Sequence, residues 1–233
     1  MANDICHTNA GQYMQATQVT RVYVWSRWLR LSHWLIAFSC LGLMASGYLM
    51  KTQPLANPGV EDLHYALTAV LLPALLVRLY LLFFGKGTDL LADCEPDIHR
   101  LSQAWEVIKF YLTLGKAPLP KWYSHNPLWG PLYLAFYFFL TLNVLSGLAL
   151  INETSFLFNL SMLDLHTLTY LFITGFTLLH IIAVFSHEVS SSSSDISGMI
   201  NGHRIFEIKQ EPGKDSGSFQ SVDLKDLMKS IKK

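Results

Sequence analysis

Four long apolar stretches restrict the fold of this chain more than any other feature. They run over residues 28–50, 63–84, 129–151 and 166–185. Each is long enough to cross a bilayer, which takes about 20 mostly apolar residues in a helix. Because lipid offers no hydrogen-bond partners, each stretch must satisfy its own backbone groups as a helix. The sequence therefore predicts an all-α integral membrane protein built as a four-helix bundle.

The charges beside these stretches predict how the chain crosses the membrane. Lys and Arg are frequent before the first stretch, between the second and third, and after the fourth. The two remaining loops, 51–62 and 152–165, contain one basic residue between them, Lys51, and several acidic ones. Because basic loops stay in the cytoplasm, we expect both termini to be cytoplasmic and these two loops to be outside.

The chain outside the four apolar stretches and these two loops is predicted to be cytoplasmic. Residues 98–114 have the pattern of an amphipathic helix that lies on the membrane surface. We expect three parts: an N-terminal extension over 1–20, the transmembrane domain over 21–189, and a C-terminal tail over 190–233. Membrane lipid is the expected surrounding of the domain.

Composition excludes several other classes of protein. Charged residues make up 15% of the chain, against roughly 25% in an average soluble domain. The 17 basic residues equal the 17 acidic ones, so a nucleic-acid partner is not indicated. The cysteines at positions 6, 40 and 94 form neither a CxxC pair nor the CxxCH motif of a covalent haem.

Four histidines, His33, His64, His166 and His180, fall within or at the ends of the apolar stretches. An ionisable side chain is costly there unless it is paired or ligated. His166 and His180 are 14 residues apart, which places both on one helix face, about 21 Å apart along the axis. With the predicted topology, two pairs form: His64 with His166 at the outer level, and His33 with His180 at the inner level. Such pairs suit the axial ligands of two six-coordinate b-type haems.

Three further residues share these levels, and each has two possible roles. Gly47 and Gly147 fall at the outer level, where a missing side chain would admit a flat macrocycle or would allow close helix packing. Arg78, 14 residues after His64, reaches the inner level. There it would pair with a haem propionate or extend to the membrane interface. A metal-ion site and a proton-relay transporter fit less well, because no Asp or Glu lies inside the stretches.

The chain resembles the b-type cytochrome subunit of membrane-bound Ni/Fe hydrogenases and, more distantly, the di-haem cytochrome subunit of formate dehydrogenase. The resemblance covers about residues 21–206. It rests on the order and spacing of several short stretches: VYVWSRWLRLSHW (22–34), SGY (46–48), LHYAL (63–67), RLY (78–80), HNPLWG (125–130), SGL (146–148) and ISGMINGHRIF (196–206).

This resemblance implies an electron-transfer subunit of an oxidoreductase complex in the bacterial inner membrane. A periplasmic, iron-sulfur-containing, hydrogenase-like partner would feed electrons through two haems to menaquinone or ubiquinone. The four histidines match the family's haem ligands, and His180, His125 and Asn126 match its quinone region. His125 has an alternative role as a cap residue of the third membrane helix.

Two other functions stay open on the sequence alone: a stand-alone cytochrome b that reacts with quinone, and a haem-free membrane anchor of a redox complex. The chain departs from the family pattern at Thr167, where a second histidine is usual, and at 186–188, where Ser-His-Glu replaces an acidic and basic cluster. His187 is expected at the surface.

Overall fold

The computed structural model describes residues 18–53, 58–91, 94, 98–190 and 195–208. Most of the predicted N-terminal extension and the tail after residue 208 lie outside the described residues. The three-part division of the chain therefore stays a prediction. The described residues confirm the predicted class, an all-α membrane bundle.

Four helices are long and apolar enough to cross a membrane among the described residues. They are α1 (Arg27–Thr52), α2 (Pro58–Phe84), α4 (Trp129–Ile151) and α5 (Met162–Ser190). Helices α1, α2 and α5 extend past the predicted stretches, whereas α4 has the predicted bounds. Capping groups set the starts of α1 and α5. The Ser26 hydroxyl accepts the Leu29 N–H to start α1, and the Ser161 hydroxyl accepts the Asp164 N–H at the start of α5.

The bundle consists of two hairpins, α1 with α2 and α4 with α5, and each hairpin packs most extensively within itself. A buried apolar cluster joins the two hairpins. Its members come from all four helices: Ile36, Cys40, Leu71, Ala74, Leu75, Phe136, Leu140, Val144 and Ile173. This cluster separates the predicted inner histidine level from the outer one.

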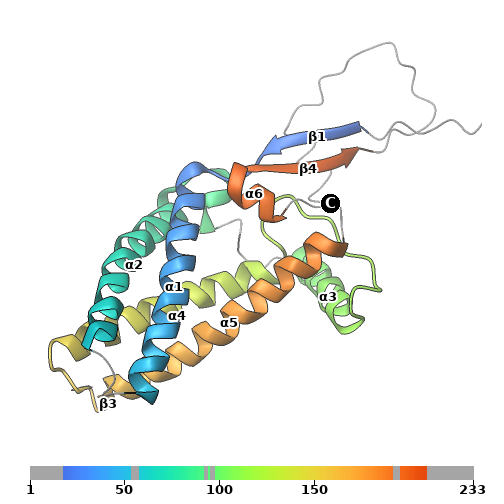
Figure 1. Cartoon of the computed structure of the whole chain (residues 1–233). Helices are drawn as coiled ribbons and strands as arrows, with labels where there is room; N and C mark the ends of the chain where they lie inside the picture. Colours follow the sequence, from blue (N-terminus) through green and yellow to red (C-terminus); the bar gives the residue numbers. More distant parts are fainter. Residues whose placement is uncertain (1–17, 54–57, 92–93, 95–97, 191–194, 209–233) are drawn as a thin grey trace, which may run out of the picture.

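An antiparallel ribbon, which the sequence did not predict, closes one end of the bundle. Strand β1 (Gln18–Tyr23) pairs with β4 (His203–Ile208), so segments from opposite ends of the chain lie side by side (Figure 1). The short helix α6 (Asp195–Asn201) leads into β4 through Gly202, which has a φ of +86°. A side chain at Gly202 would meet the Tyr23 ring and the Trp25 carbonyl, so this turn requires glycine.

The predicted surface helix is α3 (Ile98–Leu112), two residues shorter than expected. It ends there because Leu114 and Gly115 take left-handed conformations, and the Gly115 N–H bonds back to the Phe110 carbonyl. Ala104, Val107 and Phe110 are buried, so one face of α3 packs against the protein. A single 3₁₀ turn, η1 (Gly87–Asp89), follows α2.

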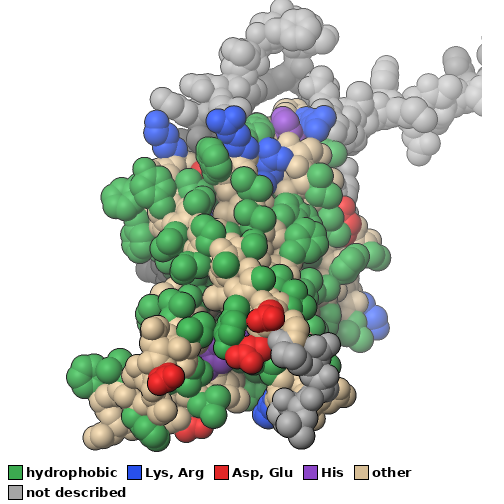
Figure 2. All heavy atoms as spheres, turned by 60° about the vertical axis from the view of Figure 1, so that its left-hand side comes forward, with side chains coloured by type: hydrophobic (Ala, Val, Ile, Leu, Met, Phe, Trp, Pro, Cys, Tyr) green, Lys and Arg blue, Asp and Glu red, His purple; other side chains and the backbone are tan. Residues whose placement is uncertain are grey.

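The opposite end of the bundle carries a small hairpin of β2 (Phe156–Leu157) and β3 (Leu160–Ser161). We call the two ends the ribbon end and the hairpin end. On the face in Figure 2, most Lys and Arg side chains gather at the ribbon end and most Asp and Glu side chains at the hairpin end. The two ends therefore differ in charge, as they do in the sequence.

Candidate functional site

A cavity of about 440 Å³ lies inside the ribbon end of the bundle, a volume typical of cofactor pockets (roughly 300–1,000 Å³). Its walls come from α1, α2, α4 and α5, together with the segment that precedes α4. Aromatic and aliphatic side chains form most of the lining. Five of the predicted site residues line it as well: His33, His180, His125, Asn126 and Arg78.

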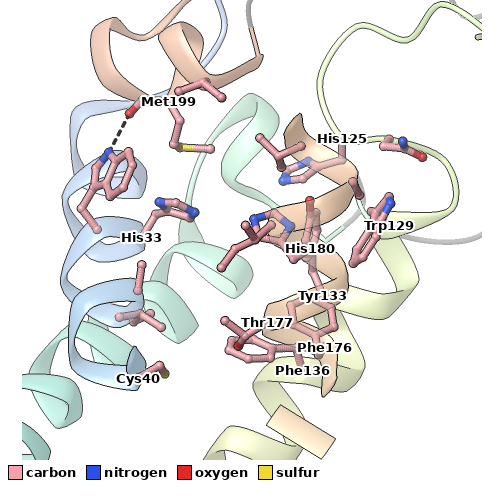
Figure 3. A pocket seen from close by; sticks show the side chains of 18 of the residues that line it. His33, Cys40, His125, Trp129, Tyr133, Phe136, Phe176, Thr177, His180 and Met199 are labelled. Carbon is pink, nitrogen blue, oxygen red and sulfur yellow. Dashed lines mark hydrogen bonds between the residues drawn. The ribbon is translucent and has the colours of Figure 1, made fainter. Parts of the chain in front are cut away.

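His33 from α1 and His180 from α5 point into this cavity from opposite sides (Figure 3). The centroids of the two imidazole rings are 6.4 Å apart, and the ring planes differ by 65°. The Nδ1 atoms of both rings are buried and have no hydrogen-bond partner among the described residues. The structure thus brings this pair together across an apolar space.

Aromatic rings fix His180 in place. Phe176, one helical turn earlier on α5, stacks on its ring with centroids 6.0 Å apart and an angle of 6°. Trp129 and Tyr133 on α4 approach the same ring edge-on at 5.6 and 5.8 Å. On the other side of the cavity, the Trp34 indole donates to the Met199 carbonyl, which ties α1 to α6.

Arg204 holds the segment that leads into α4. Its guanidinium is buried and donates to three successive carbonyls, those of Trp122, Tyr123 and Ser124, at 3.0–3.2 Å. This role could not be predicted from the sequence, because Arg204 lies about 80 residues after the segment that it holds. The contact places the next two residues, His125 and Asn126, at the cavity wall.

His125 and Asn126 present polar groups to the cavity. The His125 ring lies edge-on against Trp25 at 4.9 Å and near Tyr133 at 5.9 Å. The Asn126 side-chain oxygen accepts the Leu128 N–H at 2.9 Å, which closes a turn directly before α4. The Asn126 Nδ2 group is buried and has no partner among the described residues.

Arg78 is buried at the same end, with only 3% of its surface exposed. Its Nε donates to the Tyr137 hydroxyl at 3.1 Å, and one terminal nitrogen donates to the Asp89 carbonyl at 3.1 Å. Within the described residues no carboxylate forms an ion pair with it. The side chain therefore does not extend to an interface, and a buried guanidinium without an anion is costly.

At the hairpin end, His64 on α2 lies against α1. Its Nδ1 lies 2.9 Å from the Ser46 hydroxyl, and the adjacent Gly47 leaves room for the ring. A Cβ at Gly47 would be 3.5 Å from the His64 Cε1 atom, which is ordinary contact.

His166 on α5 lies against α4 in the corresponding way. Its Nδ1 lies 3.2 Å from the Ser146 hydroxyl and 2.9 Å from the Asn143 carbonyl. A Cβ at Gly147 would be only 3.1 Å from His166 Cε1. The structure therefore places both glycines beside the hairpin-end histidines.

The two ribbon-end histidines fit the iron of a b-type haem. Because a metal–imidazole bond is about 2 Å long, one iron between two facing rings separates their centroids by roughly 6 Å, close to the observed 6.4 Å. At the hairpin end, the Asn143 carbonyl can only accept, so His166 must carry its proton on Nδ1 and keep Nε2 free for a metal. No group of three or more His, Cys, Asp or Glu side chains that could hold a metal ion occurs among the described residues.

His187 is not at the surface, and the expectation from the sequence was wrong. Only 4% of it is exposed, and its Nε2 lies 2.9 Å from the Tyr111 hydroxyl. The Trp129 indole donates to the same hydroxyl at 2.8 Å. Helix α3, which carries Tyr111, covers His187, and periodicity along α5 alone could not reveal this cover.

Comparisons with known proteins give the family of this chain. The family model described as prokaryotic cytochrome b561 matches residues 24–202. A probable Ni/Fe-hydrogenase B-type cytochrome subunit of Azotobacter chroococcum mcd 1 is 29% identical over 81% of this chain and 90% of its own length. The same-named protein of Rhizobium leguminosarum bv. viciae is 27% identical over 84% and 94%.

A more distant relative, the probable Ni/Fe-hydrogenase 1 B-type cytochrome subunit of Escherichia coli strain K12, is 24% identical over 86% of this chain and 98% of its own length. No solved structure matches. The family match covers all four membrane helices and all four of their predicted haem ligands. The chain therefore belongs to the prokaryotic cytochrome b561 family and is a multi-pass membrane electron-transfer protein of the b type.

Proposed function

We propose that this chain carries two b-type haems and passes electrons from a periplasmic oxidoreductase to a membrane quinone. The observation that carries the proposal is the facing pair of histidines across the ribbon-end cavity, with two further histidines at the other end of the bundle. His33 and His180 face each other at 6.4 Å, and His64 and His166 lie at the opposite end with their Nδ1 atoms held. When bound, the two haems supply one-electron carriers at two membrane depths.

Each pair would bind one haem iron through its Nε2 atoms. Arg78 would hold a haem carboxylate at the ribbon end, because its buried guanidinium has no anion among the described residues. The apolar cluster between the two levels, which includes Leu71 and Leu140, keeps water out of the space between the sites.

A quinone would bind at the cytoplasmic side of the ribbon-end cavity. The Asn126 Nδ2 group is a free donor for a quinone carbonyl, and His125 lines the same cavity. Reduction of a quinone takes up protons, and a histidine near the cytoplasmic face is suited to deliver them. Menaquinone and ubiquinone both present such carbonyls.

The partner would dock at the hairpin end. This end faces the periplasm in our proposal, because the Lys and Arg side chains gather at the ribbon end. Loops 51–62 and 152–165 would form the docking surface. The relatives named above are called hydrogenase cytochrome subunits, so a hydrogenase-like, iron-sulfur-containing partner is the one we propose.

The test is the number of haems per chain in detergent-purified protein, from the pyridine haemochrome spectrum. We expect two in the wild type and one in His64→Ala or His166→Ala, with the second haem retained. His203→Gln is the matched control, because His203 belongs to β4 and lies outside the cavity. It should keep both haems.

Two results would overturn the proposal. A well-folded, haem-supplied wild type without haem would leave only the anchor function. Retention of both haems in His64→Ala and in His166→Ala would show that these residues are not ligands.

A further inference from the structure

Ser46 and Ser146 occupy corresponding places in the two hairpins. Each lies on the first helix of its hairpin, directly before a glycine, and each contacts the hairpin-end histidine of the second helix. The contacts run from Ser46 on α1 to His64 on α2, and from Ser146 on α4 to His166 on α5. Only 2% and 1% of the two serines is exposed. The same serine–histidine contact therefore occurs twice, in separate segments of the chain.

Hydrogen-bond counting gives the direction of the Ser146 contact. A serine hydroxyl has one proton, and Ser146 donates it to the Asn143 carbonyl at 2.9 Å. The same carbonyl can only accept from His166 Nδ1, so the His166 proton lies on Nδ1, the Ser146 oxygen accepts from it, and Nε2 is left free to bind a metal. Ser46 lies 2.9 Å from His64 Nδ1 and 3.3 Å from the Leu43 carbonyl, and we take the same direction for it because it occupies the corresponding place.

The ribbon-end pair lacks this support. The Nδ1 atoms of His33 and His180 are buried without a hydrogen-bond partner in the described part of the chain. Ser32, the residue before His33, is also buried and also donates to a carbonyl three residues back, that of Leu29. The difference between the two ends thus lies in the contact with histidine, and not in the presence of a buried serine.

We propose that Ser46 and Ser146 are positioning residues that set the hairpin-end haem at a lower reduction potential than the ribbon-end haem. This inference rests on the proposed function. A hydrogen bond accepted from the Nδ1 proton makes an imidazole a stronger electron donor to its metal. Stronger donation stabilises the oxidised iron and lowers its potential. Transfer from the hairpin end to the ribbon end is then downhill, toward the proposed quinone site.

The experiment is a potentiometric titration of the two haems in the purified full chain. The hairpin-end component is identified as the one absent from His64→Ala. Ser46→Ala should raise the potential of this component and leave the other unchanged. Ser146→Ala should raise it less, because His166 keeps the Asn143 carbonyl as a second acceptor. Ser46→Thr retains the hydroxyl and should return the potential to the wild-type value.

Ser32→Ala is the matched control, and we expect it to shift neither component. The inference fails if Ser46→Ala and Ser146→Ala leave the hairpin-end potential unchanged, or if both haems shift equally. If Ser46→Ala does not load haem, Ser146→Ala and Ser46→Thr still decide the question. A wild type without two haems would instead contradict the proposed function, so the two failures are distinguishable.

Discussion

The Arg78 guanidinium on α2 lies over the Tyr137 ring on α4, 5.1 Å from its centroid, and donates to the hydroxyl of the same residue at 3.1 Å. This contact links the two hairpins beside the ribbon-end cavity. It also fixes a positive charge in the bundle, and no carboxylate of the described residues forms an ion pair with it. Such a charge is stable only if something else in the assembled protein supplies the anion.

Arg78→Met should therefore act in opposite directions on the haem-loaded and the haem-free protein. Without haem, removal of an unpaired buried charge should leave the unfolding free energy equal or higher. With haem, loss of the cation should weaken retention of the ribbon-end haem by about 3–5 kcal/mol, the cost of breaking a buried ion pair. The haem content of the loaded protein and the unfolding free energy of both forms in detergent check this. Equal destabilisation of both forms would contradict the propionate role.

The two glycines at the hairpin end should respond differently to alanine. Gly47→Ala adds a methyl at 3.5 Å from the His64 ring, which is ordinary contact, and alanine favours a helix by up to about 1 kcal/mol. Gly147→Ala adds one at only 3.1 Å from the His166 ring, so overpacking should cost about 1–3 kcal/mol. The unfolding free energies of the two haem-free variants measure this difference.

Haem content of the same glycine variants separates the two roles that the sequence left open. Close helix packing predicts that Gly47→Ala keeps both haems. If Gly47→Ala folds normally but loses the hairpin-end haem, room for the macrocycle is the correct role instead.

The sequence predicted the four membrane helices, and the histidine levels on them, because both depend on short-range periodicity, whereas His125 and Asn126 came from the family resemblance. The 14 residues between His166 and His180 fix their shared face and their separation along α5. The ribbon could not be predicted, because β1 and β4 pair residues that are far apart in the chain, such as Tyr23 with His203. Such pairing leaves no local pattern.

The role of the two serines could not be predicted for a related reason. Ser46 and Ser146 belong to short stretches that resemble the family, but their role depends on a histidine of the next helix. The recurrence of a Ser-Gly pair at the same histidine level was the available signal. His187 was misplaced because its cover comes from α3, some 75 residues earlier in the chain.

Asn126 should affect reaction with quinone without affecting haem binding. Asn126→Ala removes the free Nδ2 donor, and we expect the rate of haem oxidation by a soluble quinone to fall roughly tenfold, equivalent to about 1.4 kcal/mol. The control is Asn152→Ala, because the Asn152 side chain also bonds a helix end on α4, but at the hairpin end. Stopped-flow kinetics of the dithionite-reduced protein measure both. An equal rate in Asn126→Ala and wild type would exclude this donor.

The Tyr111 hydroxyl should stabilise the docking of α3 on the bundle. It accepts from the Trp129 indole and lies 2.9 Å from His187 Nε2, to which it can donate its own proton. Tyr111→Phe leaves both buried groups without this partner, at a cost of about 1–3 kcal/mol in unfolding free energy. Tyr65→Phe is the matched control, because the Tyr65 hydroxyl bonds Glu61 at an exposed position, so its loss should change stability by less than about 0.5 kcal/mol. Unfolding in mild detergent measures both variants. Equal stability of Tyr111→Phe and wild type would show that α3 is held by its apolar face alone.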